Sequence, residues 1–263
     1  HEGYYAEQND GDNGLQMYID EARTAYKEQR VLGAQRALQF GGEQILKHQM
    51  RMYNCTSSYA DRAEFFGELF YILLCGAGAG FSVQKHHAEK MPEISERKKQ
   101  AKGYVVEDSI EGWADSLSVL MSSYFVGGGT HTEFEGRKVY FDLSQIRPNG
   151  AEISGGFKAP GPEPLRKTLD KIEHLLQGLI LSGITKLSPI HIYDIAMHSA
   201  DAVLAGGVRR SATICLFSKD DQEMMSAKTG NWFMDNPQRG RSNNSAVVVR
   251  NEITKSDFGG LPP

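Results

Sequence analysis

Cysteine is scarce in this chain of 263 residues, which holds only Cys55, Cys75 and Cys215. Three cysteines make no disulfide framework, and the Cys-x-x-Cys pattern of many zinc and redox sites is absent. We therefore expect a reducing, cytoplasmic setting. The sequence also has no run of 18 apolar residues and no signal-peptide pattern, so we expect no membrane partner.

Positive charge is not in excess, because 33 aspartates and glutamates outnumber 29 lysines and arginines and give a formal net charge of −4. A general nucleic-acid binder is normally basic, so we expect no nucleic-acid partner. Binding of single nucleotides is still compatible with this charge, since a few local groups can hold them. Metal binding is not indicated: the pair His86-His87 has no partner at metal spacing, and His191 and His198 lie two helical turns apart.

Hydrophobic periodicity alternates between helix and strand along the chain. We expect helices over residues 14–30, 34–41, 62–75, 109–125, 165–182 and 188–205. We expect strands over residues 45–55, 81–84, 104–106, 138–143, 212–217 and 246–249. The basic stretch 85–102 and the stretch 145–164 are predicted to be loops, the first of them mobile. This alternation predicts an α/β fold with mostly parallel strands, and no internal repeat interrupts it.

Cys55 is the first candidate for chemistry. Polar residues surround it, and it is the last residue of a predicted strand. One interpretation is a buried cysteine that packs as a small hydrophobe, and the other is a redox-active or nucleophilic thiol at a strand end. Cys75 and Cys215 lie inside apolar runs and are expected to be inert.

Two glycine-rich segments are candidate ligand walls. The segment 76–80 has glycine at every second position, but it follows a helix and therefore matches neither the dinucleotide fingerprint nor a phosphate-binding Walker loop. A tight helix-to-strand turn explains it equally well. The segment 206–211 joins two glycines to Arg209 and Arg210, which could donate to a phosphate or a base edge. A glycine helix cap with two solvated arginines is the alternative.

Six segments, taken in this order, resemble the catalytic subunit of ribonucleotide reductase: Asn54-Cys55, Cys75 to Gln84, Asp108 to Trp113, Ile146 to Gly150, Ala205 to Ala212 and Arg241 to Ser245. The branch that they resemble most is the adenosylcobalamin-dependent (class II) ribonucleoside-triphosphate reductases. The resemblance covers roughly residues 30 to 250. Each motif is modest alone, and their common order makes the match specific.

The resemblance implies a fold and an activity. Residues 1–30 would be a helical or loose segment, and residues 31–263 would be the N-terminal half of a ten-stranded α/β barrel. The family reduces ribonucleoside triphosphates to 2′-deoxyribonucleoside triphosphates for DNA synthesis by thiyl-radical chemistry. Its partners would be adenosylcobalamin, deoxyribonucleotide effectors that control specificity, and a thioredoxin-like reductant.

The resemblance also implies roles for particular residues. Cys55 would be one of the two cysteines that reduce the ribose 2′ carbon. The substrate-binding residues would be Asn54, Thr56, Gly76, Ala77, Gly78 and Gly80. The specificity loop between substrate base and effector would be Gly206, Gly207, Val208, Arg209, Arg210 and Ser211. The effector would bind Asp61, Gln84 and Lys85.

The chain departs from the family pattern in its cysteines. The Asn-Pro-Cys-Gly-Glu motif of the radical cysteine is absent, as are the second reducing cysteine and the C-terminal cysteine pair. We therefore expect a fragment or one part of a split enzyme, inactive without the missing C-terminal half. The alternatives are a class I ribonucleoside-diphosphate reductase large subunit and a non-catalytic nucleotide-binding remnant. By resemblance, the insert 144–165 and Val208-Arg209-Arg210-Ser211 favour class II.

Overall fold

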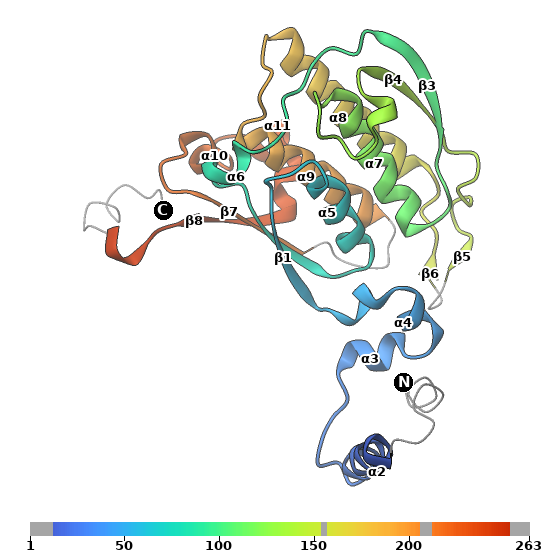
Figure 1. Ribbon diagram of the computed structural model, residues 1–263. Helices are drawn as coiled ribbons and strands as arrows, with labels where there is room; N and C mark the ends of the chain where they lie inside the picture. The colour runs from blue at the N-terminus through green and yellow to red at the C-terminus, as the bar shows by residue number, and fades with distance from the viewer. Residues whose placement is uncertain (1–12, 154–156, 206–211, 253–263) are drawn as a thin grey trace. The chain divides into compact units, whose positions relative to one another are not determined.

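The computed structural model describes residues 13–153, 157–205 and 212–252 (Figure 1). The chain divides into two compact units, His1–Asn54 and Cys55–Pro263. The expected start of the catalytic barrel at residue 31 stays a prediction. In the described part of the chain, no helix combines the length and the apolarity needed to cross a membrane.

The described part of the first unit is helical. Its elements are α2 (Asn13–Lys27), α3 (Gln35–Phe40), α4 (Glu43–Lys47) and the 3₁₀ turn η1 (Gln49–Met52). The strand predicted over 45–55 is therefore wrong. Glu43 opens α4 and Lys47 closes it, where the helix dipole favours a negative and a positive charge respectively. Four of the five residues of α4 are unbranched at Cβ and lose little side-chain freedom in a helix, which outweighs the β-branched Ile45.

The second unit is built on a four-stranded sheet in which every neighbouring pair of strands is parallel. Its order along the sheet is β1 (Cys55–Tyr59), β2 (Gly78–Ser82), β7 (Thr213–Ser218) and β8 (Ser242–Val247). The predicted α/β fold with parallel strands is confirmed. The ten-stranded barrel itself stays a prediction.

Helices and short elements fill the connections between these strands. They are α5 (Phe65–Leu74), α6 (Lys85–Ala88), α7 (Ile110–Tyr124), η2 (Thr132–Phe134), α8 (Glu163–Leu181), α9 (Pro189–Ala205), α10 (Gln222–Ser226), α11 (Trp232–Asp235), η3 (Pro237–Arg241) and, after the last strand, η4 (Arg250–Glu252). Two small sheets lie in the longest connection: β3 (Lys99–Val105) pairs in parallel with β4 (Arg137–Asp142), and β5 (Glu152–Ile153) pairs with β6 (Phe157–Lys158).

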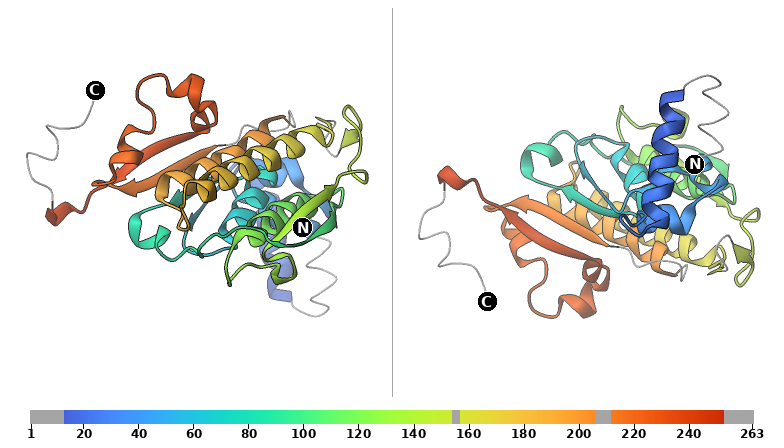
Figure 2. Two further views of the ribbon diagram at one scale, coloured as in Figure 1. Left: turned by 90° about the horizontal axis from the view of Figure 1, so that it is seen from above. Right: turned by 90° about the horizontal axis from the view of Figure 1, so that it is seen from below.

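The main hydrophobic core lies on one face of the four-stranded sheet. Strand β7 alternates between buried and more exposed residues, and Cys215 and Phe217 point into the core. Helix α5 buries Phe66, Leu69 and Phe70 there, which confirms the helix predicted over 62–75. Figure 1 shows α5 and α9 against this face, and the two views of Figure 2 show the same sheet from above and below. The order β1-β2-β7-β8 explains the placement, because right-handed crossovers that always advance in one direction put their helices on one side.

Several sequence boundaries need correction. The glycine segment 76–80 is only partly a loop, because β2 begins at Gly78. The predicted mobile loop 85–102 holds α6 and the first residues of β3. Its middle is bound to its neighbours, since Ile94 N donates to Thr185 O and Ser95 N donates to Tyr124 O.

Helix α7 begins after a serine cap. The N-cap is Ser109, whose hydroxyl accepts from Gly112 N at 2.9 Å. The neighbouring Asp108 accepts from Arg147 Nε at 2.6 Å and so forms an ion pair with a residue that is distant in the sequence.

The start of α7 leads to a prediction about two helical glycines. A Cβ added at Gly112 would lie 2.5 Å from the carbonyl oxygen of Glu107, whereas a Cβ at Gly178 in α8 would meet nothing within 4 Å. We expect Gly112→Ala to lower the free energy of unfolding by about 1–3 kcal/mol through overpacking. We expect Gly178→Ala to raise it by roughly 0.5–1 kcal/mol, because alanine loses less entropy in a helix. Urea unfolding followed by circular dichroism measures both, and equal effects would contradict the packing at Gly112.

Candidate functional site

The face of the sheet opposite the core is the candidate site, and we call it the bare face. Its residues alternate with the core residues along each strand, and most are exposed or half-buried. They are Cys55, Ser57 and Tyr59 of β1, Gly78, Gly80 and Ser82 of β2, Ile214, Leu216 and Ser218 of β7, and Asn243, Ser245 and Val247 of β8. Parallel sheets are usually covered on both faces, so a face left this open is unusual.

Cys55 is the first residue of β1, whereas sequence reasoning predicted it as the last residue of a strand over 45–55. Its side chain is exposed and forms no disulfide, so the interpretation as a buried cysteine is wrong. In the parallel register Cys55 lies beside Gly78, and Thr56 lies beside Ala79. The structure thus brings the predicted catalytic thiol next to one of the predicted substrate glycines.

The glycines of β2 leave a trough in the bare face. Gly80 lies between Ser57 of β1 and Ile214 of β7 in register, and a Cβ at Gly80 would come within 3.3 Å of Ile214 Cγ2. With no side chain at Gly78 or Gly80, the peptide backbone of β2 forms the floor. The backbones of β1 and β7 on either side lie two strand spacings apart, roughly 10 Å, and their side chains narrow the space between them.

Gly76 and Ala77 have a local structural role. Gly76 has φ +78°, its N–H donates to Leu73 O at 2.8 Å, and Ala77 N donates to Ile72 O at 3.2 Å. This hydrogen-bond pattern is a Schellman cap, which ends α5 and needs a residue with positive φ. The tight-turn interpretation therefore holds for these two residues, and their substrate contact stays a prediction.

The predicted effector residues lie at the carboxyl-terminal ends of the strands, opposite the end at which Cys55 lies. Asp61 follows the end of β1 and accepts from Arg62 Nη1 at 2.9 Å. Lys85 Nζ lies 2.6 Å from Asp220 Oδ2, and this hydrogen bond raises the pKa of Lys85. Gln84 N donates to Ser82 Oγ at 3.3 Å. The five-residue strand β1 separates the carboxyl-terminal ends of the strands from Cys55 by roughly 13 Å. The structure therefore does not bring the two predicted sites together.

Two further predicted positions need separate mention. The side chain of Asn54 accepts from Arg36 Nε at 2.8 Å within the first unit. The predicted specificity loop, Gly206 to Ser211, lies outside the described residues. Ala212 follows this segment, and its carbonyl accepts from Ala79 N at 2.9 Å, at the amino edge of the sheet where Cys55 also lies.

Sequence reasoning missed a cavity of about 700 Å³ after the end of β4. Buried Leu143 and Ile146 contribute to its lining, together with Asp142, Asn149 and Arg166. Hydrogen bonds from Ser144 lower the pKa of Asp142, which keeps it charged. Sequence reasoning did single out Ile146 to Gly150, a segment that contributes to this cavity. It named the segment as a motif of the family resemblance and not as part of a ligand site.

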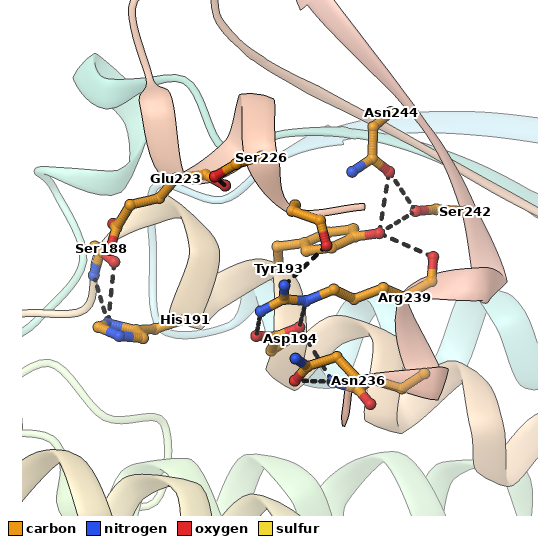
Figure 3. Close-up of polar contacts among 12 residues, drawn as sticks. Ser188, His191, Tyr193, Asp194, Glu223, Ser226, Asn236, Arg239, Ser242 and Asn244 are labelled. Carbon is orange, nitrogen blue, oxygen red and sulfur yellow. Dashed lines mark hydrogen bonds and ion pairs between the residues drawn. The ribbon is translucent and has the colours of Figure 1, made fainter. Parts of the chain in front are cut away.

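A buried polar network anchors β8 on the core side of the sheet (Figure 3). Tyr193 Oη of α9 lies 2.9 Å from Ser242 Oγ, 3.0 Å from Asn244 Oδ1 and 3.1 Å from the carbonyl oxygen of Arg239. Burial raises the pKa of Tyr193 to about 12, so the hydroxyl stays protonated and can donate. Sequence reasoning missed this network because its members lie more than 40 positions apart.

An ion pair beside Tyr193 completes the network. Asp194, only 7% exposed, accepts from Arg239 Nε at 2.8 Å and from Arg239 Nη2 at 2.6 Å. This bidentate contact raises the pKa of Arg239. The pair holds η3 against α9 immediately before β8 begins, so it helps to fix which residues of β8 face the core.

Comparisons with known proteins agree with the resemblance. Residues 81–176 match the family described as "B12-dependent ribonucleotide reductase, insertion domain". The chain is 31% identical over 229 residues to the adenosylcobalamin-dependent ribonucleoside-triphosphate reductase of Lactobacillus delbrueckii subsp. bulgaricus and 32% identical to that of Lactobacillus leichmannii. Each match covers 75% of this chain and only 29% of the relative, so the chain spans less than a third of these proteins.

The fold has a matching solved structure. A crystal structure of a B-12 dependent (class II) ribonucleotide reductase superposes with a TM-score of 0.62 and 24% sequence identity. The match covers 75% of this chain and 33% of that one. It supports the fold assignment, and the predicted similarity to class II reductases is confirmed over this part of the chain.

The exposure of the three cysteines gives a prediction for the chain itself. Cys55 is exposed, Cys75 is 2% exposed and Cys215 is fully buried. Burial also raises the pKa of the Cys215 thiol, which lowers its thiolate fraction further. We expect iodoacetamide at neutral pH to alkylate Cys55 alone in the folded chain and all three cysteines in urea. Mass spectrometry of tryptic peptides measures this, and native labelling of Cys215 would contradict the described core.

Proposed function

We propose that this chain, a relative of the adenosylcobalamin-dependent ribonucleotide reductases over 75% of its length, supplies the N-terminal half of the catalytic barrel of such an enzyme. The observation that carries the proposal is the bare face, on which an exposed cysteine stands beside a glycine-floored trough. In a barrel with its helices outside, this face would become the inner wall. The missing half would then cover it and exclude water from the reaction.

The reaction we propose is the reduction of a ribonucleoside triphosphate at its 2′ carbon. Two thiols lose two hydrogens and become a disulfide, while the 2′-hydroxyl leaves as water and a hydrogen takes its place. Cys55 would supply one thiol. Cys75, which caps the end of α5, and Cys215, which points into the core, are both buried, so neither can supply the second. The second reducing thiol and the radical cysteine would come from the missing half, and a thioredoxin-like protein would restore the dithiol.

The residues beside Cys55 would position the sugar. Gly78 and Gly80 would let the ribose approach the backbone of β2, and Thr56 and Asn54 would complete this end of the site. The segment from Gly206 to Ser211 would be the specificity loop. Asp61, Gln84 and Lys85 would bind the deoxyribonucleotide effector, with the cavity beside β4 as the competing place for it. Synthesis of DNA precursors in the cytoplasm is the proposed setting.

Adenosylcobalamin would start the radical chemistry when bound, but the described residues of the bare face do not fit it. The strands β1 and β7 on either side of the trough lie roughly 10 Å apart. They carry a thiol, hydroxyls and the apolar side chains of Ile214 and Leu216, which suit a sugar rather than a corrin ring. We assign no cobalamin contact to this chain. The proposed dependence on the cofactor is drawn from the relatives, which are adenosylcobalamin-dependent by name.

The role of Cys55 is tested by substitution in the full-length protein. We expect Cys55→Ser to abolish multiple turnovers with a dithiol reductant, because serine cannot form the disulfide, while ribonucleotide binding changes less than twofold. Cys75→Ala removes a buried thiol at the end of α5 and serves as the matched control, which should keep turnover. Radiolabelled deoxynucleotide formation and equilibrium dialysis measure the two quantities. Loss of binding in Cys55→Ser would make Cys55 a structural cysteine.

Cofactor dependence separates the alternatives. We expect no turnover from the 263 residues alone, and turnover that requires adenosylcobalamin once the missing half is present. Turnover with a ribonucleoside diphosphate and a separate radical-generating subunit would favour a class I enzyme instead. Nucleotide binding without turnover under either condition would leave a non-catalytic remnant. Turnover by the isolated chain would contradict the half-barrel proposal.

A further inference from the structure

Two consecutive asparagines in β8 have opposite surroundings. Asn244 faces the core side, where its Oδ1 lies 3.0 Å from Tyr193 Oη and 2.9 Å from Ser242 Oγ (Figure 3). Asn243 is exposed on the bare face, and its side-chain amide has no hydrogen-bond partner among the described residues. The Tyr193 network and the Asp194–Arg239 pair fix this arrangement, because a shift of one residue in β8 would exchange the two faces.

Asparagine is disfavoured in strands, so each of the two needs a physical reason. The buried hydrogen bonds to Tyr193 and Ser242 give that reason for Asn244. A solvated residue on an edge strand is the ordinary reason for Asn243, since polar side chains on edge strands hinder aggregation. However, the amide of Asn243 does not stand alone in solvent, because a hydrophobic residue of the neighbouring strand lies next to it.

That neighbour is Ile214, which pairs with Asn243 in register and is 40% exposed. Gly80 lies on the other side of Ile214, so the trough that begins at Cys55 reaches Ile214 without an intervening side chain. An apolar surface with an amide at its border suits a flat heteroaromatic ring. The ring would lie on Ile214, and the amide would offer both a donor and an acceptor to its edge.

The charge of the described strands argues against the main competitor at Asn243, which is a phosphate group. Within the described strands, the bare face carries no lysine and no arginine. A phosphate held there would lack the cationic partner that such groups usually have. A neutral base is therefore the part of a nucleotide that fits beside Asn243, while the sugar lies toward Cys55.

We propose that Asn243 contacts the base of the ribonucleotide substrate and discriminates among bases, with the Tyr193 network as the device that orients it. This inference rests on the proposed function. It adds a base-reading residue on β8, on the far side of β7 from the reducing thiol.

The test measures kcat and KM of the full-length protein with each of the four ribonucleoside triphosphates. Asn243→Ala removes one hydrogen bond to a base, so we expect KM to rise roughly two- to tenfold, unequally among the bases, with kcat nearly unchanged. Asn243→Asp keeps the shape but only accepts hydrogen bonds, so we expect it to change the order of preference among the bases. Asn231→Ala is the matched control, because Asn231 is exposed, lies off the sheet and caps no helix with its side chain.

Each outcome has a distinct meaning. Unequal KM changes in both variants support the base contact. Equal losses for all four bases overturn it, because such losses indicate a contact with a shared part of the nucleotide. Kinetics identical to wild type also overturn it and leave the proposed function standing. If the unaltered protein neither binds nor reduces any ribonucleotide, the proposed function itself fails. Thermal melting of each variant confirms that the strand still folds.

Discussion

The handedness of the strand connections is the constraint on which the second unit depends. Each successive strand of the four-stranded sheet is added on the same side of the last, and right-handed crossovers then place the long helices α5 and α9 on one face. An open doubly wound sheet reverses its strand order and covers both faces, whereas this sheet does not reverse within the described residues. The exposed thiol, the glycine trough and the polar residues of β8 share one surface because of that winding.

The two faces of the sheet carry different kinds of interaction. On the core side, aromatic and aliphatic packing from α5, α7, α8 and α9 combines with a polar network of Tyr193, Ser242, Asn244, Asp194 and Arg239. On the bare face, thiol, hydroxyl and amide groups stand on strands whose positions the core side has already fixed. Packing on one side therefore fixes the positions of the thiol, hydroxyl and amide groups on the other, which is the arrangement that a preorganised site requires.

Sequence reasoning predicted the long helices well and the register-dependent features poorly. The amphipathic pattern of residues 109–125 places α7 within one residue of its observed ends, because a stripe of apolar side chains is a local property. The strand Ser242–Val247 begins four residues before its predicted start, because Ser-Asn-Asn-Ser has little strand propensity and depends on partners in α9. Likewise, the place of Gly78 beside Cys55 follows from strand pairing, which no local pattern encodes. The cavity beside β4 depends on the fold in the same way.

The open ends of the sheet have a consequence for how such a protein is made. Within the described residues β1 and β8 are both edge strands, and each presents unpaired backbone groups while the bare face still lacks a cover. The N-terminal part of a protein leaves the ribosome first. A half-barrel would therefore keep two unpaired edge strands exposed while the rest of the chain is synthesised. Closure would remove both edges in a single event. The nascent chain would therefore depend on chaperones most strongly during that interval.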